Sequence, residues 1–356
     1  MSTRLLELLV MPTIPPSLDR LKLSYTYSLG LDKFPINTPR SPALPPVAQA
    51  FVRNVYRLKR MMLAPAFVGD LASRMQRFTD IAEFEITGAV ARSRRSPDHQ
   101  GSEIFARMRE LLAKDTRQLT DSSSADDEEM DSLVMDAIET GGSYAVLLAS
   151  AGGLMSSAFA ALLQSYVTSM WTIFETLAGD LWEAALNSKP DRLAPLKGSQ
   201  GRLKKGRPHF AAMISTPRSD TSDKTVRLEW LQTHKWNLTN KMGTVLKSKF
   251  DFSSLDGIRE AYACAFESGT ETAEIDKILL DDALDILSAL RNVIVHGGGN
   301  SHREYLARRK FLPALPEAQE GQPIPLDGEN VSKTIGEALF CAATLLAKVD
   351  DWLLSH

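Results

Sequence analysis

The chain has 356 residues, of which 44% are hydrophobic and 24% charged, and its formal net charge is −3. This composition excludes collagenous, mucin-like and wholly disordered chains, and the slight net acidity excludes a protein that attracts polyanions through its overall charge. The two cysteines, Cys264 and Cys341, are too few for a disulfide framework or a cysteine zinc site. We therefore expect a cytoplasmic protein whose length predicts two domains, or one large domain with an appendage.

Residues 1–129 form the first predicted domain, an N-terminal region to which the sequence assigns no function. Proline is abundant up to residue 48, which predicts an extended arm with one edge strand at 21–29. Helices are expected over 47–118, with Val52, Val55 and Tyr56 on one apolar stripe. The acidic run S-S-S-A-D-D-E-E that follows predicts a linker or exposed loop, since it lacks the glycine and terminal glutamate of a calcium loop.

Residues 130–356 form the second predicted domain, a bundle of long helices closed by its terminal helix. The apolar spacing predicts helices over 158–187, 226–249, 274–296 and from 327 to the end. Asn330 or Ser332 is the expected cap of the last helix. The fold class predicted for the whole chain is all-α, with a mostly helical N-terminal extension. Four tryptophans are expected in the core rather than as base-stacking platforms: Trp171, Trp182, Trp230 and Trp236.

The stretch 141–174 is the one candidate for a membrane span, because it carries no charge over its whole length. Serines, threonines and the pair Gly152-Gly153 dilute this stretch, and no basic cluster flanks it. We therefore expect a pair of buried core helices and no contact with a membrane.

Most common catalytic signatures are absent from the sequence. It has no G-x-S-x-G elbow, no H-E-x-x-H zinc helix and no G-x-x-x-x-G-K-[ST] phosphate loop, and no two histidines have metal-ligand spacing. We therefore expect neither a metal nor a cofactor.

The segment R-N-V-I-V-H at 291–296 is the strongest candidate for chemistry. At about 100° per residue, Asn292 and His296 share one side of a helix, and Arg291 must reach them with its long side chain. The glycines at 297–299 end the helix and allow a ligand close to the imidazole. Arginine binds phosphate through a charged fork, and histidine exchanges protons near neutral pH.

The same segment resembles the motif of the HEPN superfamily, in which an Arg, often followed by Asn, precedes a His by four to six intervening residues. The resemblance covers about 155–356 and implies a HEPN-like helical bundle. It also implies a metal-independent endoribonuclease in which Arg291 and His296 act on RNA, Asn292 orients the imidazole or donates to the phosphate, and Glu175 is a carboxylate partner. A homodimer that faces its two motifs together, and a role in prokaryotic defence or stress as a toxin or antiviral nuclease, follow from the same resemblance. Family toxins regulated by a nucleotidyltransferase carry a tyrosine two positions after the His, where this chain has Gly298.

The same sequence allows other interpretations. Arg94 with His99, and Arg227 with His234, have similar spacing, but the first pair spans a turn and the second has no following Asn. In one alternative, the Arg291 and His296 side chains have only structural partners, namely backbone carbonyls and Asp281, Asp282 or Asp285. The basic loop 202–209 either contacts RNA or is simply solvated. The protein as a whole is alternatively a catalytically silent interaction protein that binds a partner or regulator through its N-terminal region, or a nucleotide-binding domain.

Overall fold

A computed structural model gives the structure of the chain. It describes residues 39–58, 61–62, 78, 80–82, 84–85, 106–107, 110–111, 153–198, 203, 232, 238, 240–267 and 269–356. The regular elements of this part are all α-helices, and its one β contact is an isolated bridge between Asn300 and Pro323. The all-α prediction is confirmed for these residues.

The chain divides into two compact units. The first consists of Met1–Leu29 with Arg60–Phe159, and the second of Gly30–Lys59 with Ala160–His356. In the first unit the described positions are helical, and Arg107 Nε lies 2.8 Å from a carboxylate oxygen of Glu85. The predicted edge strand at 21–29, the acidic run and the predicted boundary after residue 129 lie outside the described residues.

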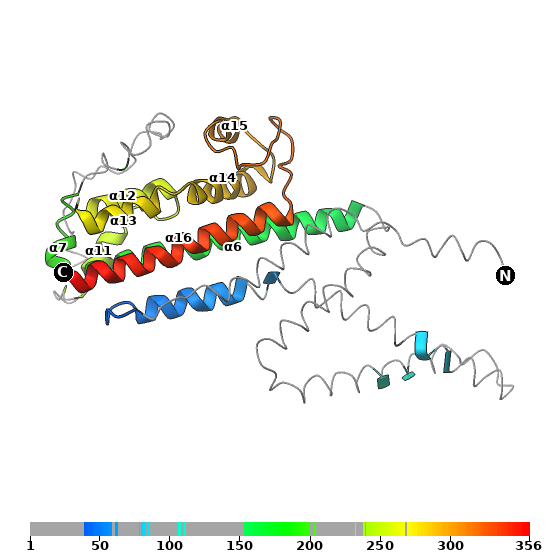
Figure 1. Ribbon diagram of the computed structural model, residues 1–356, viewed down its shortest axis with the longest axis horizontal. Helices are drawn as coiled ribbons and strands as arrows, with labels where there is room; N and C mark the ends of the chain where they lie inside the picture. The colour runs from blue at the N-terminus through cyan, green and yellow to red at the C-terminus, as the bar shows by residue number, and fades with distance from the viewer. Residues whose placement is uncertain are drawn as a thin grey trace. The chain divides into compact units, whose positions relative to one another are not determined.

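The helix α6 (Gly153–Ser188) belongs to the second unit from Ala160 onward and runs along the length of its bundle (Figure 1). The stripe predicted for it is confirmed, because Leu163, Val167, Met170, Phe174, Leu177 and Leu181 are all buried. Burying each such side chain contributes about 1.5–3 kcal/mol. Trp171 and Trp182 are core residues as expected, and the indole nitrogen of Trp182 donates to the carbonyl of Ala261 at 2.9 Å. No helix of the described part is long and apolar enough to span a membrane.

The segment predicted as one helix over 274–296 is two helices, α13 (Thr270–Leu279) and α14 (Asp282–Gly297). The break falls at Asp281, which adopts an extended backbone and whose carboxylate accepts a hydrogen bond from the Ala283 N–H at 2.9 Å. An aspartate in this position satisfies an N–H that has no partner within the helix. The prediction of a single helix was therefore wrong, although its apolar face is buried on both sides of the break.

The helix α16 (Gly328–Ser355) closes the bundle against α13 and α14. Its predicted stripe is buried throughout: Val331, Ile335, Leu339, Ala342, Leu346, Val349 and Leu353. Its cap is neither Asn330 nor Ser332 but Asp327, which accepts from the Asn330 N–H at 2.8 Å. The charged carboxylate binds that N–H more strongly than a neutral side chain would.

The end of the proline-rich arm belongs to this bundle. Asp350 on α16 accepts the backbone N–H groups of Arg40 and Ser41 at 2.9 and 2.8 Å. A helix then runs over 45–58 and begins with two prolines, which suit a first turn that needs no N–H partner. Its buried face comprises Ala48, Phe51, Val55 and Leu58, and Leu44 just before it is buried too. Tyr56, predicted on the apolar stripe, is instead 55% exposed, so that expectation was wrong.

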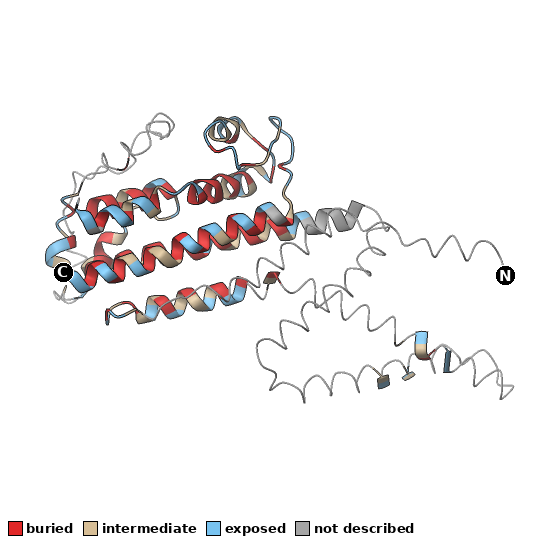
Figure 2. Cartoon of the chain, viewed as in Figure 1, coloured by how far each residue is buried: buried red, intermediate tan, exposed pale blue. Residues whose placement is uncertain are grey.

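The remaining helices of the unit are short. They are α7 (Pro190–Leu193), α11 (Met242–Lys247), α12 (Leu255–Ala265) and α15 (Arg303–Arg309). Most of the helix predicted over 226–249 lies outside the described residues. Within them, Asn240 has a left-handed backbone with φ of 57° and α11 covers only Met242–Lys247, so the predicted helix is not continuous to residue 249. Figure 2 shows that α12 and α14 bury most of their residues.

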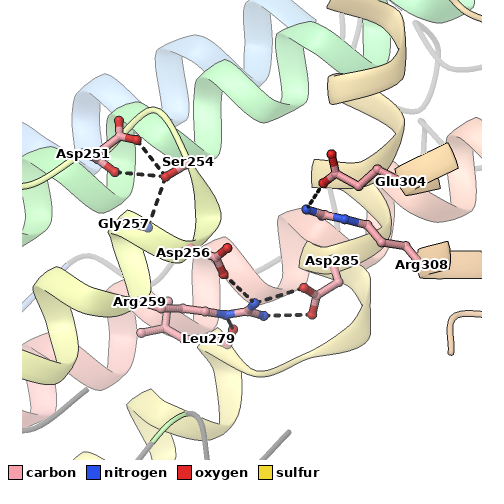
Figure 3. Close-up of polar contacts among 9 residues, drawn as sticks. All are labelled: Asp251, Ser254, Asp256, Gly257, Arg259, Leu279, Asp285, Glu304 and Arg308. Atoms are coloured by element: carbon pink, nitrogen blue, oxygen red, sulfur yellow. Dashed lines mark hydrogen bonds and ion pairs between the residues drawn. The ribbon is translucent and has the colours of Figure 1, made fainter. Parts of the chain in front are cut away.

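A buried ion pair joins α12 to α14 (Figure 3). Arg259 donates to both carboxylate oxygens of Asp285 at 3.0 and 2.8 Å, and its Nε donates to the carbonyl of Leu279 at 2.8 Å. Because Leu279 ends α13, this one guanidinium connects three helices. It thereby fixes the first turns of α14, which carries the candidate motif at its other end.

Candidate functional site

The end of α14 is shaped by two glycines in the left-handed region. Gly298 has φ of 59° and its N–H bonds to the Val293 carbonyl, which closes the helix. Gly299 has φ of 86°, and a Cβ placed there would lie 2.6 Å from the amide nitrogen of Gln164 on α6. Conformation and close approach both favour glycine after the motif. The chain thus turns sharply just beyond His296 and leaves the imidazole exposed.

The three polar residues of the motif converge, as helix geometry predicted. Arg291 Nη1 donates to Asn292 Oδ1 at 3.0 Å and lies 3.4 Å from His296 Nε2. A guanidinium can only donate, so Nε2 is the acceptor in this contact. In the tautomer that accepts there, this nitrogen carries the lone pair that a general base uses.

Trp171 and Glu175 of α6 complete the surroundings of Arg291. The Arg291 guanidinium carbon lies 6.0 Å from the centroid of the Trp171 ring, within the range of a cation–π interaction. Glu175 is one helical turn further along the same face of α6 and interacts electrostatically with Arg291. The sequence singled out Glu175 but not Trp171, which was expected only in the core. The spacing of four residues between them was the available signal.

The pKa of Glu175 lies above its usual range. Burial raises it, and repulsion from Asp251 adds to the rise, whereas the Trp171 indole N–H and the Arg291 charge oppose it. That indole N–H is buried and makes no hydrogen bond of ordinary geometry with any described residue, so its contact with Glu175 is weaker than a full hydrogen bond. Glu175 therefore gives up its proton less readily than an exposed glutamate.

Arg291 makes no ion pair within 4.0 Å in the part of the chain that the structure describes. Asp285, weighed above as its structural partner, is instead bound to Arg259. Asp281 caps α14 at the opposite end of the helix from the motif. The half-buried Arg291 thus retains a charge that no nearby carboxylate neutralises through direct contact.

A metal centre has no support in the described ranges, where no three His, Cys, Asp or Glu side chains are grouped to hold an ion. Both cysteines are buried thiols, and burial raises the pKa of the Cys341 thiol to about 12. They are therefore poorly suited to act as ligands or nucleophiles.

Several rival candidates lie outside the described residues: Arg94, His99, Arg227, His234, and the basic loop at 202–209 apart from Leu203. Trp230 and Trp236 lie outside them too. Among these candidates, the motif at 291–296 is the one whose side chains the structure describes.

Comparison of the chain with models of known protein families, with curated proteins and with solved structures found no match.

Proposed function

We propose that the protein is a metal-independent endoribonuclease of the HEPN type, whose HEPN-like bundle carries Arg291, Asn292 and His296. The observation that supports this most is a half-buried arginine with no ion pair among the described residues, held beside an exposed histidine. A phosphodiester supplies the missing anion. We further propose that it acts in prokaryotic defence or stress, as the resemblance of its motif implies.

RNA carries its own nucleophile, so the reaction needs few groups from the protein. His296 removes the proton of the ribose 2′-hydroxyl, and the oxygen attacks the neighbouring phosphorus. The bond from phosphorus to O5′ breaks, the leaving oxygen takes up a proton, and a 2′,3′-cyclic phosphate remains. Arg291 stabilises the negative charge that develops on the phosphorane oxygens.

The neighbours of Arg291 hold its guanidinium in place. Trp171 supports the guanidinium from α6, and Asn292 accepts one of its N–H groups. Glu175 attracts the guanidinium when it is ionised, but from beyond ion-pair distance, and its raised pKa weakens this attraction, so it competes little with phosphate for the arginine. These residues are positioning residues, whereas Arg291 and His296 are the catalytic pair.

The test is cleavage of total RNA by the purified protein in excess chelator. We expect activity that falls by about two or more orders of magnitude in His296→Ala and in Arg291→Ala. His99→Ala serves as the matched control and should retain wild-type activity. Circular dichroism of each variant checks that its helices are intact. A strict requirement for magnesium, or full activity in His296→Ala, contradicts the proposal.

One alternative is favoured by the same unpaired charge, namely a nucleotide-binding domain that holds phosphate without cleaving it. It predicts nucleotide binding that Arg291→Ala abolishes and His296→Ala leaves intact, with RNA uncut in both cases. Isothermal titration with the two variants separates it from the nuclease.

A further inference from the structure

The segment that begins with the motif is far more basic than the chain as a whole. Residues 291–311 contain five lysines and arginines against one acidic residue, Glu304, whereas the full chain has a net charge of −3. Apart from Arg291 these cations lie on α15 or at its end, and α15 follows the motif after a short turn and contacts α14. The local charge is therefore concentrated beside the candidate site.

The cations of α15 divide into two groups. Arg308 pairs with Glu304 at 2.8 Å, and Arg309 pairs with Glu317, so the charges of both are used within the protein. The side chains of Arg303 and Lys310 are exposed and make no ion pair or hydrogen bond with any residue that the structure describes. These two cations are available to an external anion.

The periodicity of α15 places these two cations on one face. Lys310, the C-cap, keeps a helical backbone, and seven residues correspond to nearly two turns, so Arg303 and Lys310 project in the same direction about 10 Å apart along the axis. Tyr305, two residues after Arg303, projects to the opposite side and is fully buried. The Arg303–Lys310 face therefore points away from the core.

Hydrogen bonds hold α15 in place relative to the end of α14. Ser301 N–H donates to the Gln322 carbonyl at 2.8 Å, and the Gly321 N–H returns a bond of 2.8 Å to Ser301. The Ile324 N–H donates to the Gly299 carbonyl at 2.9 Å, and the Tyr305 hydroxyl donates to the Pro316 carbonyl at 2.7 Å. Because these bonds fix both ends of the segment 299–324, the exposed cations of α15 keep a fixed position relative to the motif.

We propose that Arg303 and Lys310 bind the phosphate backbone of single-stranded RNA that extends from the site at Arg291 and His296. This inference rests on the proposed function, since the adjoining site is what identifies the polyanion as RNA. A single strand keeps its 2′-hydroxyl free to reach an in-line position, and backbone contacts bind it without regard to sequence.

The expected effect follows from counterion release. The logarithm of affinity changes by about 0.7 per phosphate contact for each tenfold change in salt on a single strand. Loss of two contacts thus lowers affinity about 25-fold at 0.1 M salt, taking 1 M salt as the point where the electrostatic contribution vanishes. The salt slope itself should decrease by about 1.4.

The test measures fluorescence anisotropy of a labelled 2′-O-methyl oligoribonucleotide, which retains its phosphates but has no hydroxyl to attack. We compare the wild type with Arg303→Ala/Lys310→Ala across a salt series. The charge-preserving pair Arg303→Lys/Lys310→Arg should bind as the wild type does. The control pair Arg53→Ala/Arg57→Ala removes two exposed arginines from helix 45–58, which is held on α16 at Asp350, and should also bind normally.

Each outcome separates this proposal from the proposed function. Weaker binding and a smaller salt slope in the Ala pair alone support the surface, whether or not the protein cleaves unmodified RNA. An equal loss of affinity in both Ala pairs shows general charge attraction and overturns the proposed surface. Unchanged binding in the Ala pair also overturns it, and then cleavage lost in His296→Ala still supports the nuclease. Failure of any single-stranded RNA to bind, with an acidic protein bound instead, overturns both.

Discussion

Asparagine in place of Asp285 tests the buried connection that orients the motif helix. The Asp285 side chain is 3% exposed and accepts two hydrogen bonds from Arg259, whose own side chain is 10% exposed. Asparagine has nearly the same shape but no charge, so the guanidinium stays buried and charged. The amide oxygen can still accept one of the two hydrogen bonds, and Arg259 otherwise keeps the bond to the Leu279 carbonyl and the 3.8 Å contact with the half-exposed Asp256.

The magnitude follows from the cost of an uncompensated buried charge. Removal of one partner from such a pair costs about 3–5 kcal/mol, and the remaining interactions of Arg259 place this case near about 3 kcal/mol. In a unit of this size, 1 kcal/mol shifts the melting temperature by about 2–4 °C, so we expect a decrease of about 6–12 °C.

Thermal melts and urea unfolding followed by circular dichroism measure this effect, with Asp256→Asn as the matched control. The control removes a carboxylate that is 45% exposed and should cost less than about 1 kcal/mol. Arg259→Met/Asp285→Leu removes both charges together and should recover much of the loss. If Asp285→Asn is as stable as Asp256→Asn, the pair is not desolvated and the reasoning is wrong.

Three further predictions concern the site. Cleaved RNA should carry 2′,3′-cyclic phosphate or 3′-phosphate ends by chromatography, and 5′-phosphate ends would exclude attack by the 2′-hydroxyl. Because burial raises the pKa of Glu175 in the folded state, the wild type loses stability as pH rises through that raised value. Glu175→Gln, which stays neutral, should therefore gain unfolding free energy over the wild type at high pH and match it in acid; a difference independent of pH refutes this. If a dimer faces its motifs together, mixing wild type with His296→Ala at fixed total protein should reduce activity with the square of the wild-type fraction, and a linear decrease from a monomer contradicts it.

The sequence predicted a helix correctly where one apolar stripe ran along its whole length. The stripes of α6 and α16 were predictable because their buried residues recur every three or four positions. The same rule missed the break between α13 and α14, since apolar residues continue on one face through Leu279 and Ala283. The cap at Asp281 overrides periodicity, and a pair of adjacent aspartates was the only local sign of it.

The geometry of the site was predictable within its helix and not between helices. Helix angles alone indicated that Arg291 would have to reach toward Asn292 and His296, and its Nη1 does contact both. The Trp171 ring beside the guanidinium depends on how α6 packs against α14, which no local pattern encodes. The helix α15 was missed because seven residues give only about two turns and little periodicity, whereas α12, with eleven residues and a serine cap, was missed although its pattern was readable.

Two arginines of this bundle have opposite surroundings, and the difference bears on function. Arg259 is bound by a carboxylate through two hydrogen bonds and by a backbone carbonyl through a third, so its charge is fully used in joining helices. Arg291 is held by an amide, an aromatic ring and an imidazole, none of which carries a full negative charge. A bundle that needed Arg291 only for stability would gain more from a direct carboxylate partner, as Arg259 has. These interactions fix the position of the guanidinium without neutralising its charge. That is the arrangement expected of a group that binds an anionic ligand.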